Sequence, residues 1–243
     1  MLSTLLKSMA RAVLPKTSRD FIRRLGYRCL APWYWGRRVT CPLCGSRFRR
    51  FKTFVVDPTY HNLMCPWCQS LERHRLLLLF LRHRTEIFSR PLRLLHLAPE
   101  YCLYRAFRSA PHLAYLTAGL DTALIQVELD LVHTPFKDDL FEVIICCHVL
   151  EHIEDELAAL RELRRVLKPG GLLFLSDLRR DMFAPVRWFM WLVTKPKEIR
   201  PGLLTSINAA YTPTEVKARL AESRFTDFTV SCNPMGLHVK ADK

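Results

Sequence analysis

Apolar and polar positions between residues 141 and 176 follow a pattern whose period changes twice. Val143–Cys147 is a continuous apolar run rich in β-branched residues, as expected for a strand buried on both faces of a parallel sheet. From Ile153 to Leu167 the apolar residues recur at helical spacing, with acids first and arginines last, as a helix dipole favours. Pro169-Gly170-Gly171 should stop this helix, and Leu172–Ser176 is a second apolar run. The segment therefore predicts a strand, a helix and a strand, with polar residues where the first strand ends.

Short apolar runs on both sides of this unit continue the alternation. Strands separated by helical connections are typical of an α/β fold with a doubly wound, mostly parallel sheet, here of seven strands. Thr212-Pro213-Thr214-Glu215 has the sequence of a capping box and predicts a helix to about Glu222. The last two strands should form an antiparallel pair. The further strands are expected at Leu92–Ala98, Leu113–Ala118, Ile125–Leu129, Phe225–Ser231 and Leu237–Lys240, with a helix at Tyr101–Ser109.

Two Cys-x-x-Cys pairs precede the predicted sheet. Cys41 and Cys44 are followed, after twenty intervening residues, by Cys65 and Cys68. Two such turns facing one another supply four sulfurs in the tetrahedral arrangement that zinc prefers, so the spacing predicts a small zinc ribbon. A disulfide or redox pair is the alternative. The other five cysteines have no partner at ligand spacing and are expected to be buried apolar residues.

These patterns divide the chain into four parts. Residues 1–38 form a basic amphipathic leader, residues 39–69 the zinc ribbon and residues 70–90 a linking helix, which Ser70 could cap. The sheet domain spans 91–243 and contains an insert at 177–208.

The positive charge is concentrated at the front of the chain. The 243 residues carry a formal net charge of +14, and residues 1–93 alone contain 19 Lys and Arg against four acidic residues. A basic N-terminal region of this kind is suited to bind RNA or an anionic membrane surface. The alternative is a basic face that contacts only solvent. Within the ribbon, aromatic residues alternate with basic ones, as on polyanion-binding surfaces. These residues are Arg47, Phe48, Arg49, Arg50, Phe51, Lys52 and Phe54.

The N-terminal segment is compatible with more than one kind of targeting signal. The leader has Lys7 and Arg11 within its apolar positions, which excludes a secretory signal, but it resembles both an organelle presequence and a surface-lying amphipathic helix. No apolar run approaches the roughly 20 residues that span a bilayer. The expected location is cytoplasmic, with peripheral attachment to a membrane as an alternative.

The order of motifs in the sheet domain resembles that of class I S-adenosylmethionine-dependent methyltransferases, particularly the small-molecule, type 11-like group. The motifs are Asp130, Pro135-Phe136, Phe141-Glu142-Val143-Ile144, the segment HVLEHI from His148, and the Pro-Gly-Gly stop. The resemblance covers about Leu92 to Lys240. It is specific for the superfamily and says little about the methyl acceptor.

The resemblance implies S-adenosylmethionine as cofactor and assigns residues to it. Asp121 would accept from the ribose hydroxyls, Asp130 would meet the adenine amino group, and Leu131 would offer a backbone amide. His148 would line the methionine side. A turn-capping role is the alternative for both aspartates.

The loop after the first strand departs from the family pattern. It reads Leu97-Ala98-Pro99-Glu100 and lacks the usual glycine. Ala98 and the fixed proline could still form a narrow turn, and Glu100 could accept from the cofactor's amino group.

Methyl transfer from a sulfonium is an in-line displacement that needs positioning and desolvation rather than a nucleophile. No catalytic residue is therefore evident, and His148 and Tyr211 are the weak candidates. Glu151 and His152 are interpreted mainly as helix-start residues, with a catalytic base as the alternative.

Three functions remain open. The first is a methyltransferase acting on a small-molecule or glycan acceptor, chosen by the basic ribbon and the aromatic insert at 177–208. The second is a ribosomal RNA base methyltransferase, because enzymes of that kind also join a zinc ribbon to this fold. The third is a non-catalytic zinc-ribbon binding protein on a methyltransferase fold.

Overall fold

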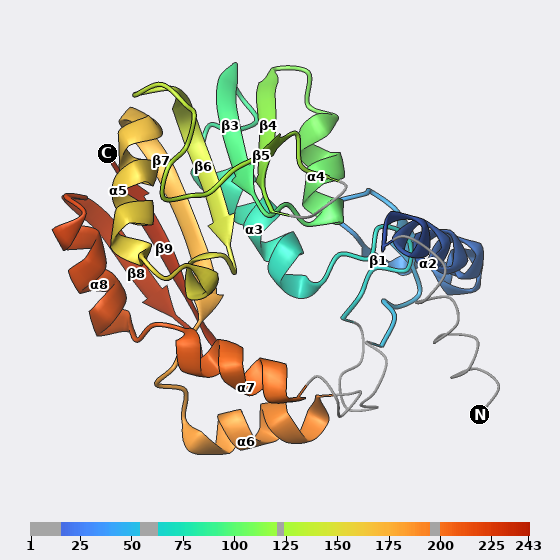
Figure 1. Cartoon of the computed structure of the whole chain (residues 1–243). Coiled ribbons are helices and arrows are strands. Elements are labelled where there is room, and N and C mark those ends of the chain that lie inside the picture. Colours follow the sequence, from blue (N-terminus) through green and yellow to red (C-terminus); the bar gives the residue numbers. More distant parts are fainter. Residues whose placement is uncertain (1–15, 54–62, 121–123, 195–199) are drawn as a thin grey trace. The chain divides into compact units, whose positions relative to one another are not determined.

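A computed structural model of the chain describes residues 16–53, 63–120, 124–194 and 200–243 (Figure 1). The chain divides into two compact units between Arg84 and Thr85.

The N-terminal unit is built around a pair of short antiparallel strands. Helix α2 (Lys16–Leu30) leads through a 3-10 turn, η1 (Ala31–Tyr34), into β1 (Trp35–Thr40), which pairs with β2 (Arg47–Phe48). Helix α3 (Glu72–Arg84) closes the unit. It is shorter than the predicted linking helix, because the segment after Arg84 leaves the helical conformation.

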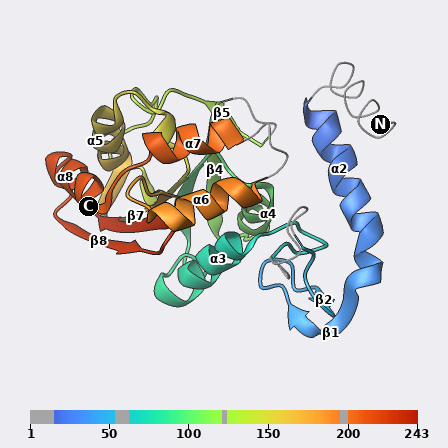
Figure 2. The same cartoon turned by 90° about the horizontal axis from the view of Figure 1, so that it is seen from below.

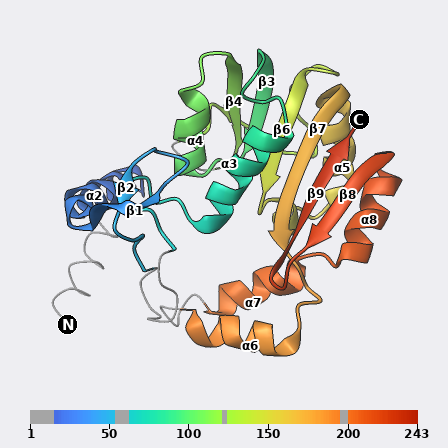
Figure 3. The same cartoon turned by 180° about the vertical axis from the view of Figure 1, so that it is seen from behind.

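The second unit contains the predicted sheet, whose strand order is β5-β4-β3-β6-β7-β9-β8. The first five strands run parallel, and β9 pairs antiparallel with both β7 and β8 (Figure 3). The seven-stranded, mostly parallel fold is thus confirmed, including its antiparallel end. The strands are β3 (Leu92–Leu97), β4 (Leu113–Gly119), β5 (Val127–Glu128), β6 (Phe141–Cys147), β7 (Leu167–Leu178), β8 (Asp227–Cys232) and β9 (Gly236–Asp242).

Helices cover both faces of this sheet. On one face, α5 (Glu156–Val166) and α8 (Pro213–Glu222) bury their apolar sides against alternate residues of the strands, such as Leu95 and Leu97. On the other face, His96 packs edge-on against Phe107 of α4 (Tyr101–Arg108), with ring centroids 5.7 Å apart. Because neighbouring residues of a strand point to opposite faces, this alternation is what doubly wound packing requires.

The insert folds into two helices at one end of the sheet. They are α6 (Ala184–Val193) and α7 (Arg200–Ala209), and they lie beyond the carboxyl ends of the parallel strands (Figures 1 and 2). The insert begins later than expected, because β7 continues to Leu178 in register with β9.

The start and the stop of α5 differ from the prediction. The helix begins at Glu156 rather than Ile153, because the Asp155 carboxylate accepts a hydrogen bond from the Ala158 amide and caps it. Leu150–His152 forms a separate 3-10 turn, η2. At the other end, α5 stops at Val166, and the Pro-Gly-Gly segment belongs to β7.

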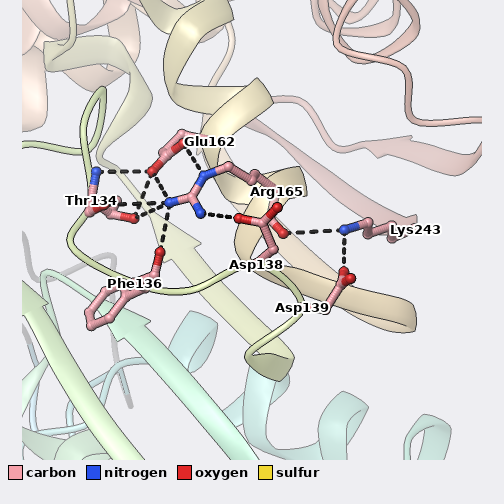
Figure 4. A network of polar contacts seen from close by, with 7 residues as sticks. All are labelled: Thr134, Phe136, Asp138, Asp139, Glu162, Arg165 and Lys243. Atoms are coloured by element: carbon pink, nitrogen blue, oxygen red, sulfur yellow. Dashed lines mark hydrogen bonds and ion pairs between the residues drawn. The ribbon is translucent and has the colours of Figure 1, made fainter.

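The loop between β5 and β6 is fixed to α5 by one arginine (Figure 4). The Arg165 guanidinium donates to both carboxylate oxygens of Glu162, at 2.6 and 2.7 Å, and to the Phe136 carbonyl at 2.8 Å. It also pairs with Asp138, while Glu162 accepts from the Thr134 amide at 3.0 Å. These contacts hold the pKa of Glu162 at about 2, chiefly through the hydrogen bonds from Arg165.

Candidate functional site

The four cysteines of the ribbon converge in the N-terminal unit. The Sγ atoms of Cys41 and Cys68 are 3.7 Å apart, as are those of Cys44 and Cys65, and all four lie within 4.8 Å of one another. Four sulfurs held about 2.3 Å from one tetrahedral ion would be about 3.8 Å apart. The arrangement therefore fits zinc.

The two cysteine turns have the same backbone. Cys41 N–H donates to Ser46 O and Gly45 N–H to Cys41 O; in the second turn Cys65 N–H donates to Ser70 O and Gln69 N–H to Cys65 O. The residue after the second cysteine is left-handed in both turns, with φ of 71° at Gly45 and 60° at Gln69. Two matching turns of this kind present their thiols to a common point.

Ser70 differs from its predicted role as a helix cap. It is fully buried, and its hydroxyl lies 3.4 Å from the Cys41 sulfur and 3.2 Å from the Cys68 sulfur. Such a contact orients ligand sulfurs and supplies them with a hydrogen bond.

The other cysteines divide into two groups. Cys102, Cys146 and Cys147 are buried, as predicted. Cys29 and Cys232 are exposed, so the expectation that they fill a core is wrong. Cys29 lies in α2, and Cys232 lies in the edge strand β8.

In the second unit, unusual backbone conformations gather at the carboxyl edge of the sheet. Ala98, directly after β3, has φ of 46°, and His148, directly after β6, has φ of 55°. Gly119, at the end of β4, has φ of 151°, and a Cβ there would lie 3.4 Å from the Ala98 amide nitrogen. Ala98 thus adopts the conformation that a glycine would take, so the glycine-free loop still makes a narrow turn. Strained residues of this kind are concentrated at binding sites.

The described residues among those predicted to bind a cofactor have varied surroundings. The Glu100 carboxylate is 3.4 Å from Nε2 of the buried His96. Asp130 is exposed, and its Oδ1 accepts from the Val132 amide at 3.0 Å, which is the turn-capping contact given above as its alternative. The side chain of Leu131 is buried in the core. Asp121 lies outside the described residues.

His148 belongs to a cluster that the sequence interpretation missed. Its Nδ1 is 3.5 Å from Oδ1 of Asp177, near the end of β7, and the Glu151 carboxylate completes the group within 4.8 Å. Glu151 lies in η2 rather than at the start of α5, so its interpretation as a helix-start residue is wrong. Burial, together with the neighbouring Asp177 carboxylate, raises the pKa of Glu151 to about 8.

Tyr211 lies half-buried beside this edge. Burial raises the pKa of its hydroxyl to about 12, and the nearby carboxylates of Glu156 and Asp177 add to the rise. A phenol with that pKa stays protonated at neutral pH, so Tyr211 is suited to donate a hydrogen bond and not to act as a base.

The arginines of the insert hold it together. Arg200 donates to the Leu192 and Thr194 carbonyls at the end of α6, at 2.7 and 2.9 Å, and Arg187 donates to the Asn208 side chain at 2.7 Å. Large apolar side chains remain on the surface, with Phe183 71% exposed and Trp188 62% exposed. The accessible face of α6 is therefore aromatic rather than basic.

Comparison with known proteins finds a similarity within the second unit. Residues 106–175, from α4 into β7, match a family profile described as a methyltransferase domain. This match covers less than a third of the chain. The YcgJ protein of Bacillus subtilis superposes on it with a TM-score of 0.50 at 16% identity, covering 70% of this chain and 98% of that protein. At this identity the likeness shows the shared fold.

Curated relatives match the chain over short stretches. A ubiquinone biosynthesis O-methyltransferase of Haemophilus ducreyi is 39% identical over 57 residues, which is 24% of this chain and 24% of that protein. A ubiquinone/menaquinone biosynthesis C-methyltransferase of the same organism is 33% identical over 60 residues, or 25% of this chain and 23% of that protein. The chain thus spans about a quarter of the length of these relatives.

Proposed function

We propose that this protein transfers a methyl group from S-adenosylmethionine to a small acceptor molecule. The methyltransferase-domain match carries the proposal. The carboxyl edge of the sheet supports it, since Ala98 makes a glycine-like turn beside Gly119 there. In open parallel sheets ligands bind at this edge.

The residues at the edge have separate roles in this proposal. S-adenosylmethionine would supply the methyl group. Ala98 would let the backbone approach the cofactor, Glu100 would accept from its amino group, and Asp121 would accept from its ribose. Asp130 caps the turn through Oδ1, and among the described residues its other carboxylate oxygen accepts no hydrogen bond, so that oxygen would accept from the adenine amino group. In-line displacement then depends mainly on orienting the acceptor and excluding water from it, and less on a catalytic base.

The acceptor that fits best is a small molecule with an apolar body. The insert arginines are engaged within α6 and α7, while Phe183 and Trp188 are exposed beyond the carboxyl ends of the strands. Relatives that match the domain are named for ubiquinone and menaquinone biosynthesis, whose quinone products have apolar bodies. Both points favour an apolar acceptor over a glycan.

Calorimetric titration of the zinc-loaded protein with S-adenosylmethionine and S-adenosylhomocysteine tests the activity. We expect both to bind, and we expect Asp121→Ala to weaken binding at least tenfold. Asp227→Asn, which changes an exposed acid at the start of β8, is the control and should bind as the wild type does. If neither compound binds the folded protein at millimolar concentration, the non-catalytic alternative replaces this proposal.

We further propose that the N-terminal unit rests on an anionic membrane. Helix α2 exposes Phe21, Ile22 and Leu25, each more than half accessible, on one side, and Trp33 in η1 is 76% exposed. Exposed aromatic and aliphatic residues among arginines suit a lipid interface better than an RNA backbone. No helix in the described ranges has the length and apolar character to cross a bilayer, so attachment would be at the surface.

Sedimentation with lipid vesicles tests this attachment. The protein should bind vesicles containing phosphatidylglycerol and not vesicles of pure phosphatidylcholine. The double change Phe21→Ser and Leu25→Ser should abolish binding, whereas Leu76→Ser, at an exposed position of α3, should not. Salt-sensitive binding to single-stranded RNA without vesicle binding would support the RNA alternative instead.

A further inference from the structure

Two buried carboxylates and a histidine meet where β6 and β7 end. The two strands pair in parallel with Cys147 opposite Ser176, so the next residues, His148 just after β6 and Asp177 near the end of β7, lie side by side. The tight turn that follows brings Glu151 back to the same place, and one ligand atom from each residue lies within 4.8 Å of the others.

The two carboxyl groups of this cluster are withdrawn from solvent. The Glu151 side chain is only 4% exposed and that of Asp177 only 8%. Glu151 Oε2 is fully buried and accepts no hydrogen bond from any residue that the structure describes, while Oε1 is 3.3 Å from Nε2 of the exposed His152. Among the residues that the structure describes, no lysine or arginine pairs with either carboxylate. Two buried carboxylates side by side repel one another, and a bound cation removes that cost.

The geometry points to a divalent cation held by His148, Glu151 and Asp177. One imidazole nitrogen and two carboxylate oxygens form a ligand set that suits Mn²⁺, Fe²⁺, Co²⁺ or Zn²⁺. Ligand atoms about 2.1 Å from a common ion can lie up to about 4.2 Å apart, so the His148–Asp177 separation of 3.5 Å already fits.

The backbone positions His148 for this role. Its φ of 55° is a left-handed conformation, which is uncommon for a residue other than glycine, and its amide donates to the Ser176 carbonyl at 2.8 Å. Three protein ligands leave coordination positions open. Water would fill them or, if the proposed methyl transfer is correct, an oxygen atom of the acceptor.

Titration with Mn²⁺, followed by the loss of the free-ion electron paramagnetic resonance signal, tests the site. The full chain is first loaded with one equivalent of zinc, which the four thiolates bind in preference to the nitrogen and oxygen ligands of this cluster, so that the added Mn²⁺ reports on this cluster. We expect one Mn²⁺ per chain, and at least tenfold weaker binding in Glu151→Gln and Asp177→Asn. His133→Gln, at an exposed histidine, is the control and should bind Mn²⁺ as the wild type does.

The wild-type result alone decides the matter if a variant fails to fold. Absence of Mn²⁺ binding at millimolar concentration to the folded, zinc-loaded protein would overturn the site. Equal weakening in His133→Gln would overturn the assignment of ligands. S-adenosylmethionine binding is measured separately, so the cation site can fail its test while the proposed methyl transfer stands, and the reverse also holds.

Discussion

Left-handed residues other than glycine occupy the second cysteine turn and the loop after β3. Gln69 has φ of 60° in the second cysteine turn, and Ala98 has φ of 46° in the loop after β3. A side chain in this region costs roughly 1 kcal/mol or more, because Cβ approaches the backbone. Neither position reveals this conformation in the sequence, since the surrounding contacts impose it. The cysteine spacing, by contrast, predicted all four thiols of the ribbon, because each pair lies within one local turn.

The matched turns of the ribbon allow a paired test. Gln69→Gly should raise the free energy of unfolding by about 0.5–1 kcal/mol, because glycine adopts a positive φ without strain. Gly45→Gln at the equivalent position should lower it by about 1 kcal/mol. Urea unfolding of the zinc-loaded protein measures both. If both changes shift stability in the same direction, the two turns are not equivalent.

The loop after β3 allows a second test at this scale. Ala98→Val should destabilise the protein by about 2 kcal/mol, because a β-branched residue is strongly disfavoured at a positive φ. It should also weaken S-adenosylmethionine binding, because the added methyl groups crowd the narrow turn. Ala98→Gly should keep both properties near those of the wild type. Thermal unfolding and calorimetry give the two readouts, and an unaffected Ala98→Val variant would contradict this account of the loop.

Elements with a local signal follow the prediction most closely. The capping box at α8 is complete, since the Thr212 hydroxyl accepts from the Glu215 amide and the Glu215 carboxylate accepts from the Thr212 amide. The start of α5 was misplaced, because apolar periodicity continues back to Ile153, whereas the Asp155 cap decides where the helix begins. The helices of the insert gave no clear periodic pattern, and their packing depends on Arg200 contacts that form only in the fold.

The network around Glu162 makes stability depend on pH at the scale of α5 and its loop. The pKa of Glu162 is lowered to about 2 from an ordinary value of 4.5, mainly by Arg165. A lowered folded-state pKa stabilises the protein above pH 4.5, and that stabilisation is lost as the pH falls from 4.5 toward 2. Glu162→Gln should therefore cost about 2 kcal/mol at pH 7 and almost nothing near pH 2.

Urea unfolding at several pH values measures this dependence. Glu222→Gln is the control, because Glu222 forms an exposed pair with Arg219 on α8. An exposed pair of this kind contributes about 0.5 kcal/mol or less. A cost for Glu162→Gln that does not change with pH would show that packing, rather than charge, gives the residue its effect.

At the scale of the whole molecule, part of the candidate site depends on pairing between strands that are far apart in the sequence. The sequence alone does not show which residues this pairing brings together. Asp177 reaches His148 only because β6 and β7 pair in one particular register, and Glu151 joins them through the turn between β6 and α5. The parallel register could have revealed the pair, because residues that follow two neighbouring strands leave the same edge. The doubly wound, mostly parallel sheet, in contrast, followed from the alternation of apolar runs along the chain, whereas the order of its strands did not.

The division into two units predicts that zinc supports only the first of them. The apolar core of the N-terminal unit is small, so binding energy from zinc should account for most of its stability. Chelation should therefore expose the backbone amides of residues 31–53 and 63–70 to hydrogen exchange, while β3, β4, β6 and β7 stay protected. The variant Cys44→Ser should reproduce this pattern without chelator. Cys29→Ser changes an exposed cysteine outside the cluster and should not. Loss of protection in the sheet as well would show that the two units fold as one.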